Sequence, residues 1–218
     1  MWYIAIIFVF GLGFALVLDS PMARLKSVFR LVYFIPYTVP GVVASIMWGF
    51  MYSPSLNPIL GYLGVTNANG PLSQPHLIPA ILNIAAWIGI GYYMTLYYTG
   101  LTAIPIDIYD AASIDGCGQF KLALRIKIPL LARTIVMTLV LAAIGSLQLF
   151  AEPYVLSSLT TVPNNYTPNL DAFTTAFNYT NIPYASTLSV SFGLMCILAT
   201  VVVLVFRTRL SSSGYEEI

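Results

Sequence analysis

The chain has 218 residues, of which 58% are hydrophobic and 8% are charged, and its formal net charge at pH 7 is +1. A soluble domain usually carries about 25% charged residues, and a chain of this length cannot bury so much apolar surface in a core of its own. The composition therefore predicts a protein embedded in a lipid bilayer, and the small number of basic residues excludes a charge-driven nucleic-acid binder.

Segments long enough to cross a bilayer recur along the chain. A helix needs about 20 mostly apolar residues to span the hydrocarbon. The first such segment lacks the basic start and the cleavage site of a signal peptide, so we expect it to remain as a membrane helix. The segments are Met1–Leu18, Leu31–Tyr52, Leu77–Leu101, Leu130–Phe150 and Tyr184–Phe206. They predict an all-α fold, a polytopic transmembrane helix bundle that forms a single membrane domain over residues 1–218.

The Lys and Arg residues predict how this bundle is oriented. They form three clusters at the ends of alternate spans, whereas segments 53–76 and 151–183 contain neither residue type. Because cytoplasmic loops attract Lys and Arg, we expect the clusters to face the cytoplasm and the neutral segments to face outward from the plasma membrane. The first span then starts outside, and we expect one further helix before it. The clusters are Arg24, Lys26 and Arg30; Lys121, Arg125, Lys127 and Arg133; and Arg207 and Arg209.

The cytoplasmic segment 102–129, between the third and fourth spans, carries helix start and stop signals. Pro105 suits the first turn of a helix, and Asp107 suits its positive end. Gly116 predicts the end of that helix, because glycine readily takes the left-handed conformation that follows a helix. A second helix then leads into the next span. These signals alone are equally consistent with a surface helix that only anchors the loop.

The same segment contains a motif. Residues Asp110 to Gly116 read Asp-Ala-Ala-Ser-Ile-Asp-Gly, and Pro129 follows thirteen positions after Gly116. This pattern resembles the EAA loop of permease subunits in type I ABC importers. Three positions depart from the family pattern: Asp110 replaces Glu, Cys117 replaces Ala, and Ala123 stands where Phe is usual.

The resemblance extends over nearly the whole chain. Phe34–Pro40, Gly100–Pro105 and Gly145–Phe150 have counterparts in the maltose-type branch of sugar permeases. The resemblance implies a core of about six helices, of which this chain holds five. It also implies that a second permease subunit and an extracytoplasmic solute-binding protein complete the importer.

The resemblance further implies that segment 102–129 is the coupling helix loop, which docks on a separate pair of ATP-binding subunits. The chain has no Gly-x-x-x-x-Gly-Lys phosphate loop of its own, so we expect ATP and Mg to be bound by that partner and this chain to be a transport subunit rather than an enzyme. We expect it to have no catalytic residue, no metal site and no cofactor. The residues expected to contact the ATPase are Asp110, Ala111, Ala112, Asp115 and Gly116.

By positional resemblance, a substrate path is expected between this chain and the second permease. Tyrosine rings stack on sugar faces, although membrane tyrosines often only anchor helices at the interface. The spans offer no basic residue well inside the membrane, which favours a neutral sugar or a related solute over an anion. The residues expected to line the path are Tyr37, Gly41, Gly89, Tyr92, Ser146 and Gln148.

Other functions remain open at this stage. A secondary transporter needs carboxylates or histidines inside its spans, and the sequence shows none well inside them. A channel would carry a filter repeat or a charged ring, and neither is visible. A non-transporting membrane assembly subunit is the alternative that the sequence excludes least well. Glu152, just after the fourth span, is expected to be a solvated loop acid, with a contact to substrate or binding protein as the alternative.

Overall fold

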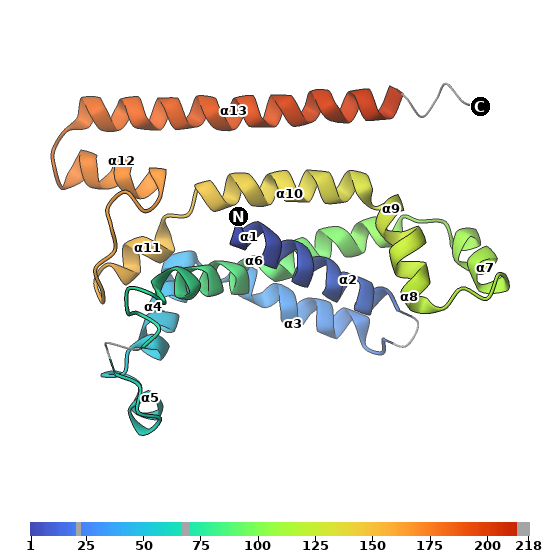
Figure 1. The fold of residues 1–218 in the computed structure, drawn as a ribbon, viewed down its shortest axis with the longest axis horizontal. Coiled ribbons are helices and arrows are strands. Elements are labelled where there is room, and N and C mark those ends of the chain that lie inside the picture. The colour runs from blue at the N-terminus through green and yellow to red at the C-terminus, as the bar shows by residue number, and fades with distance from the viewer. Residues whose placement is uncertain (21–22, 67–69, 213–218) are drawn as a thin grey trace. The chain divides into compact units, whose positions relative to one another are not determined.

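The computed structural model describes residues 1–20, 23–66 and 70–212, with side chains described as far as residue 201. Within these ranges the chain forms helices joined by turns, and no strand occurs there (Figure 1). The all-α prediction is therefore confirmed. The predicted basic cluster of Arg207 and Arg209 lies outside the residues whose side chains are described.

Four helical runs in the described part are long and apolar enough to cross a membrane. They correspond to the first, third, fourth and fifth predicted spans. The runs are Trp2–Asp19, Leu77–Thr102, Ala132–Leu156 and Ile182–Val201. The elements in them are α1 (Trp2–Ile6), the π-helical turn η1 (Ile7–Gly11), α2 (Leu12–Asp19), α6 (Leu77–Thr102), α10 (Ala132–Leu147), α11 (Ala151–Leu156) and α13 (Ile182–Ser212).

The second predicted span consists of two helices instead of one. Helix α3 (Lys26–Thr38) ends before Val39, whose backbone is extended, and α4 (Gly41–Tyr52) begins after Pro40. Proline has no N–H to donate, and it disfavours helical backbone in the residue before it. Counted as one broken span, this pair brings the candidate spans in the described residues to five, as predicted.

The chain divides into two compact units. The first comprises Met1–Pro40 and Ala86–Ala142, and the second comprises Gly41–Ala85 and Ala143–Ile218. Helices α6 and α10 each contribute one part to both units.

In the first unit, close helix contacts depend on small residues of the spans. A Cβ added at Gly11 in η1 would lie 3.3 Å from a side-chain atom of α6. Gly91 of α6 lies directly against the backbone of Tyr33 in α3, where no side chain fits. Helix α10 is joined to α6 by the hydroxyl of Thr138, which donates to the Tyr97 hydroxyl at 2.7 Å. Small residues at such contacts are typical of helix packing in membranes, where backbones approach closely.

The first unit also carries the segment between the third and fourth spans, which folds as a series of short helices. Figure 1 shows these helices close together, where α6 ends and α10 begins. They are α7 (Ile106–Ile114), α8 (Gln119–Leu122), the π-helical turn η2 (Ala123–Lys127) and α9 (Ile128–Leu130), which leads directly into α10.

In the second unit, α4 packs against α11, and α12 (Pro168–Phe177) lies beside α13. A Cβ at Gly41 would lie 3.3 Å from the Cβ of Ala151, and one at Gly49 would lie 2.8 Å from Leu159. Both glycines therefore permit the close approach of α4 to the α11 segment. The short helix α5 (Pro58–Tyr62) follows α4 and begins at the side-chain cap of Asn57.

Candidate functional site

Helix α7 begins and ends where the sequence predicts. Pro105 precedes it, and Asp107 lies in its first turn. Gly116 has a φ of 69°, in the left-handed region. The Cys117 amide donates to the Ala112 carbonyl at 2.9 Å, which is the 6→1 hydrogen bond of a Schellman motif. The predicted helix, its stop and the helix that follows are therefore confirmed.

Three bulky apolar residues of this helix–turn–helix are exposed, among exposed polar and charged side chains. The exposed fractions are 70% for Ile106, 86% for Ile114 and 78% for Phe120. All three lie beyond the candidate spans, so burial in the hydrocarbon core does not account for them. Exposed apolar groups outside the spans are available for contact with a partner or with the membrane surface. Sequence reasoning did not single these residues out, although bulky apolar residues inside a charged loop are the signal for them.

The predicted ATPase-contact residues are not all exposed. Asp110, Ala111, Asp115 and Gly116 are exposed, whereas Ala112 is buried, with 6% of its surface exposed. Because Ala112 has a small side chain, α7 can pack closely against the rest of the first unit. The contact role of the other four residues stays a prediction.

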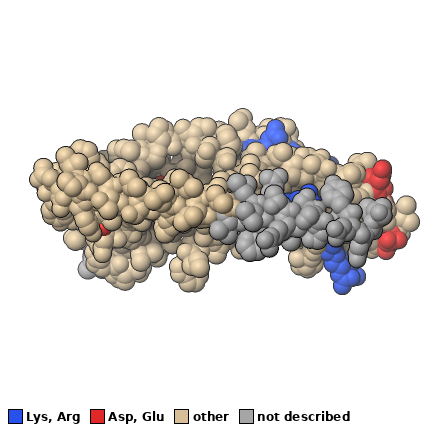
Figure 2. Space-filling model, turned by 90° about the horizontal axis from the view of Figure 1, so that it is seen from above, with Lys and Arg blue, Asp and Glu red and all other residues tan. Residues whose placement is uncertain are grey.

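Charged side chains gather around the same segment. Figure 2 shows blue and red groups at the end where Figure 1 labels α7 and α8, while the rest of the described surface in that view is almost entirely tan. One charged pair is buried there: Lys127 Nζ lies 2.6 Å from Asp19 Oδ2. Lys127 Nζ also lies 5.1 Å from the centre of the Tyr109 ring. Burial, with the nearby Asp19 charge as the lesser cause, raises the pKa of Tyr109 to about 12, so its hydroxyl stays protonated.

Three predicted path residues belong to the first unit, and the structure brings two of them together. The rings of Tyr37 and Tyr92 stack with centroids 4.7 Å apart and an interplanar angle of 15°. Gly89 instead faces the first helix, because a Cβ there would lie 2.8 Å from the Tyr3 hydroxyl. The structure thus gives Gly89 a packing contact, and its place on a path stays a prediction.

The other three predicted path residues belong to the second unit. Gly41 lies at the α4–α11 contact described above. The Ser146 hydroxyl donates to the Ala143 carbonyl at 2.7 Å, within its own helix. The Gln148 backbone carbonyl accepts a hydrogen bond from the Asn169 side chain at 3.1 Å. Their role on a path likewise stays a prediction.

The expectation that Glu152 is a solvated loop acid is wrong. Its exposed fraction is 7%, and it lies in the first turn of α11. A Cβ at Gly41 would lie 3.9 Å from Glu152 Oε1, so the carboxylate lies beside the start of α4. The packing of α4 on α11 buries it, and that packing joins segments about 100 residues apart in the chain.

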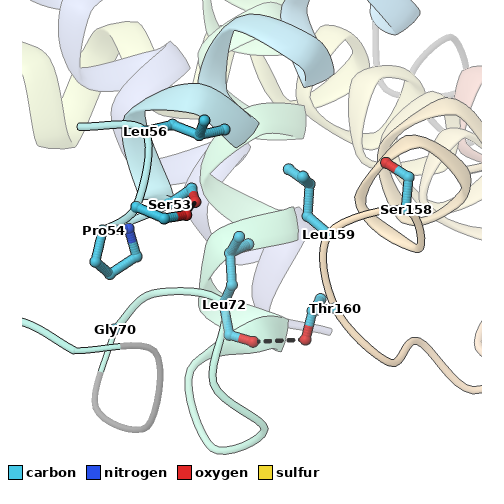
Figure 3. Close-up of a pocket in the computed structure, with 9 residues that line it drawn as sticks. Ser53, Pro54, Leu56, Gly70, Leu72, Ser158, Leu159 and Thr160 are labelled. Atoms are coloured by element: carbon cyan, nitrogen blue, oxygen red, sulfur yellow. Dashed lines mark hydrogen bonds between the residues drawn. The ribbon is translucent and has the colours of Figure 1, made fainter.

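The two neutral segments that are predicted to face outward meet in the second unit (Figure 3). The Thr160 hydroxyl donates to the Leu72 carbonyl at 2.8 Å, and the Gln74 side chain donates to the Thr161 carbonyl at 2.7 Å. Such contacts require both segments to lie on one side of the membrane, in agreement with the charge pattern. Between them is a pocket of about 330 Å³ with uncharged walls, lined by Ser53, Pro54, Ser55, Leu56, Gly70, Leu72, Ser158, Leu159 and Thr160.

The residues described offer no group of His, Cys, Asp and Glu side chains that could hold a metal ion. The first unit thus offers an exposed helix–turn–helix over residues 106–120, called the knob below, a largely buried ion pair and two stacked tyrosines. The second unit offers an uncharged pocket. The candidate spans indicate a polytopic helical membrane protein.

Comparison with known proteins identifies the family. The family model described as "Binding-protein-dependent transport system inner membrane component" matches residues 7–213, and the chain belongs to this family. It is therefore a multi-pass inner membrane protein of the kind that serves binding-protein-dependent transport.

Curated relatives include permeases of both archaea and bacteria. The "Trehalose/maltose transport system permease protein MalF" of Thermococcus litoralis is 33% identical over 80% of this chain and 58% of the relative. The "Lactose transport system permease protein LacF" of Rhizobium radiobacter is 31% identical over 88% of this chain and 67% of the relative. The chain thus spans roughly three fifths to two thirds of the length of these relatives.

A solved structure shares the fold. The bacterial alginate ABC transporter in complex with an alginate-bound periplasmic protein matches with a TM-score of 0.77, at 16% identity. The match covers 93% of this chain and 72% of that chain. At this identity the likeness concerns the fold alone.

Proposed function

We propose that the chain is the membrane-spanning subunit of an ATP-driven importer that takes up a neutral sugar or a related solute. A binding protein outside the membrane delivers the solute, and a second permease subunit completes the path. Membership of the binding-protein-dependent family supports this function. The single structural observation that carries it is the exposed apolar knob around α7, which has the form of a docking element.

Coupling to ATP hydrolysis is assigned to this knob. Ile106, Ile114 and Phe120 offer an apolar surface, and the Gly116 turn fixes the direction of the chain after α7. A separate pair of ATP-binding subunits covers this surface. Closure of that pair moves α7, and the continuous helical path from η2 through α9 passes the movement to α10.

The solute class follows from the chemistry of the candidate path and from the relatives. The stacked pair Tyr37 and Tyr92 offers an aromatic face of the kind that packs on sugar rings. The relatives named above are described as permeases for trehalose and maltose or for lactose. In the described part of the chain, four candidate spans are unbroken, and Arg133 is the one basic residue within them. It lies near the start of its span, so the middle of these spans has no basic residue to bind an anion. An uncharged solute is therefore favoured.

The proposal is tested with the complete importer in proteoliposomes. Uptake of radiolabelled disaccharides is measured with and without internal ATP, in the presence of the binding protein. We expect uptake only with ATP. Uptake driven by an ion gradient without ATP would identify a secondary transporter, and a complex that binds the ATPase but moves no solute would identify an assembly subunit.

The docking step is tested with a matched pair of glycine variants. Gly116→Val forces a β-branched residue into a left-handed conformation, whereas Gly118 has a φ of −68° and accepts valine. A Cβ meets no atom within 4 Å at either position, so the two variants differ in backbone strain and not in crowding. We expect Gly116→Val to lose the ATPase subunit on purification and Gly118→Val to retain it. Equal retention by both variants would contradict the docking role.

A further inference from the structure

Behind the exposed knob, three segments that are distant in the sequence meet at one buried charge. Asp19 is the last residue of α2, Tyr109 lies in the middle of α7, and Lys127 is the last residue of η2. The side chains of Lys127 and Asp19 are 5% and 15% exposed, and they are separated by 108 positions in the chain. The cluster therefore connects the end of the first span to two helices, α7 and η2, of the segment between the third and fourth spans.

The position of Asp19 explains why it needs a cation. A carboxylate at the C-terminal end of a helix faces the negative end of the helix dipole, which is unfavourable. Lys26 Nζ lies 3.5 Å from the Asp19 backbone carbonyl, and Lys127 supplies the direct partner of the carboxylate. Lys121, on the same helical segment as Lys127, is exposed. Lys127 is thus set apart from its basic neighbour by burial and by its partner.

Tyr109 connects this pair to α7. The Lys127 ammonium lies over the tyrosine ring within the range of a cation–π contact. The Tyr109 hydroxyl also donates a long hydrogen bond of 3.4 Å to the Leu101 carbonyl near the end of α6. Because the phenol stays protonated, it keeps this donor at physiological pH. Tyr109 therefore holds α7 both to the ion pair and to the span that precedes it.

Lys127 ends an irregular stretch of helix. The five residues of η2 form a π-helical turn, which is rare and often marks a functional position, since it rotates the side chains that follow. The turn lies directly between α8 and α9, on the path from the knob to α10. Along the chain, Lys127 thus lies between the knob and α10.

We propose that Asp19, Lys127 and Tyr109 form a positioning cluster that keeps α7 in register with the first span and with α10, so that ATP-driven movement of α7 reaches the membrane helices. The inference rests on the proposed function. None of the three residues is among those assigned to contact the ATPase. The cluster acts through the coupling helix and has no contact with ATP or solute assigned to it.

The test distinguishes a loss of the position of α7 from a failure of the protein to fold. Lys127→Met leaves a buried carboxylate without its partner and can fail to fold, whereas Asp19→Asn with Lys127→Met removes both charges, a change that buried pairs often tolerate. Lys127→Arg keeps the charge, and Lys121→Met is the matched control at an exposed position of the same segment. Each variant is assembled into the complete importer, and three quantities are measured: abundance in the membrane, co-purification of the ATPase, and solute taken up per ATP hydrolysed.

We expect the neutral double variant to assemble and to hydrolyse ATP, with uptake per ATP reduced about tenfold, the size of a typical coupling between two sites. Lys127→Arg and Lys121→Met should keep the ratio of the native importer. A merely structural role would lower abundance and leave the ratio unchanged, so a native ratio in the double variant overturns the cluster alone. Absence of ATP-dependent uptake by the native importer would overturn the proposed function and the cluster with it.

Discussion

At the scale of single residues, two glycines are required for different reasons, one by the local backbone conformation and one by a neighbouring helix. Gly116 is required by the backbone alone, because its φ of 69° belongs to the turn after α7. Gly91 is required by a neighbour, because the backbone of Tyr33 occupies the place of its Cβ. The first requirement is visible in the sequence as a helix stop, whereas the second depends on which helix lies opposite.

A pair of glycine substitutions in the first unit tests this distinction. Gly91→Ala drives a methyl group into backbone atoms of α3, which cannot yield as a flexible side chain can, and we expect a loss of roughly 3 kcal/mol or more. Gly13→Ala, also within a candidate span, meets no atom within 4 Å, so we expect no loss and a gain of up to about 1 kcal/mol from helix propensity. Unfolding of the purified protein in detergent, followed by circular dichroism, measures both. Equal stability of the two variants would contradict the close contact between α6 and α3.

Glu152 and Lys127 show the same division for charged residues. Both stand beside loop-like sequence, and both are buried by partners far along the chain. Sequence reasoning expects a solvated acid in the first case and treats the second as one member of a basic cluster. What the sequence does not show is the neighbour: the start of α4 for Glu152, and the carboxylate of Asp19 for Lys127.

At the scale of helices, the boundaries of α7 follow from local chemistry. Pro105, Asp107 and Gly116 act within a turn of their own positions, so they specify the helix without any tertiary contact. The exposure of Ile106 and Ile114 does not follow in this way. The face on which a short helix packs is decided by Ala112 and Tyr109, which lie against the rest of the unit.

A charge placed on the exposed face of α7 tests whether a partner covers it. Ile114→Asp should weaken co-purification of the ATPase at least tenfold, because desolvating an unpaired carboxylate opposes docking. It should leave the fold intact, since Ile114 is 86% exposed. Ser113→Asp adds the same charge one residue earlier, nearer the side on which Tyr109 lies, and should have a smaller effect. Pull-down of the ATPase from detergent-solubilised membranes measures both, and undiminished binding by Ile114→Asp would exclude this face as the docking surface.

At the scale of the whole molecule, contacts within the units agree with the sidedness that the charges predict. Asp19 and Lys127 join two segments assigned to the cytoplasm, and Thr160 joins the two neutral segments assigned to the outside. These contacts show which segments share a side. The assignment of either side to the cytoplasm still rests on the distribution of Lys and Arg.

Thiol labelling in intact cells tests that assignment. Cys117 follows the α7 turn and is half-buried, and Ser158 borders the uncharged pocket and is exposed. We expect a membrane-impermeant maleimide to label Ser158→Cys in intact cells, in a background with Cys117 and Cys196 replaced by serine. Native Cys117, with Cys196 replaced, should be labelled only after the membrane is opened. Labelling of Cys117 in intact cells would place the knob outside and overturn the docking proposal.

The sequence by itself determines the apolar spans, the helix stop at Gly116 and the resemblance to a permease, because these depend on composition and on backbone chemistry within a few residues. The break of the second span at Pro40 has a local cause as well, but it was recognised only in the structure. The pairing of Asp19 with Lys127, the inward face of Ala112 and the burial of Glu152 became known only from the tertiary structure. Each of these features depends on a neighbour in another part of the chain, and no local pattern specifies which distant segment will arrive there.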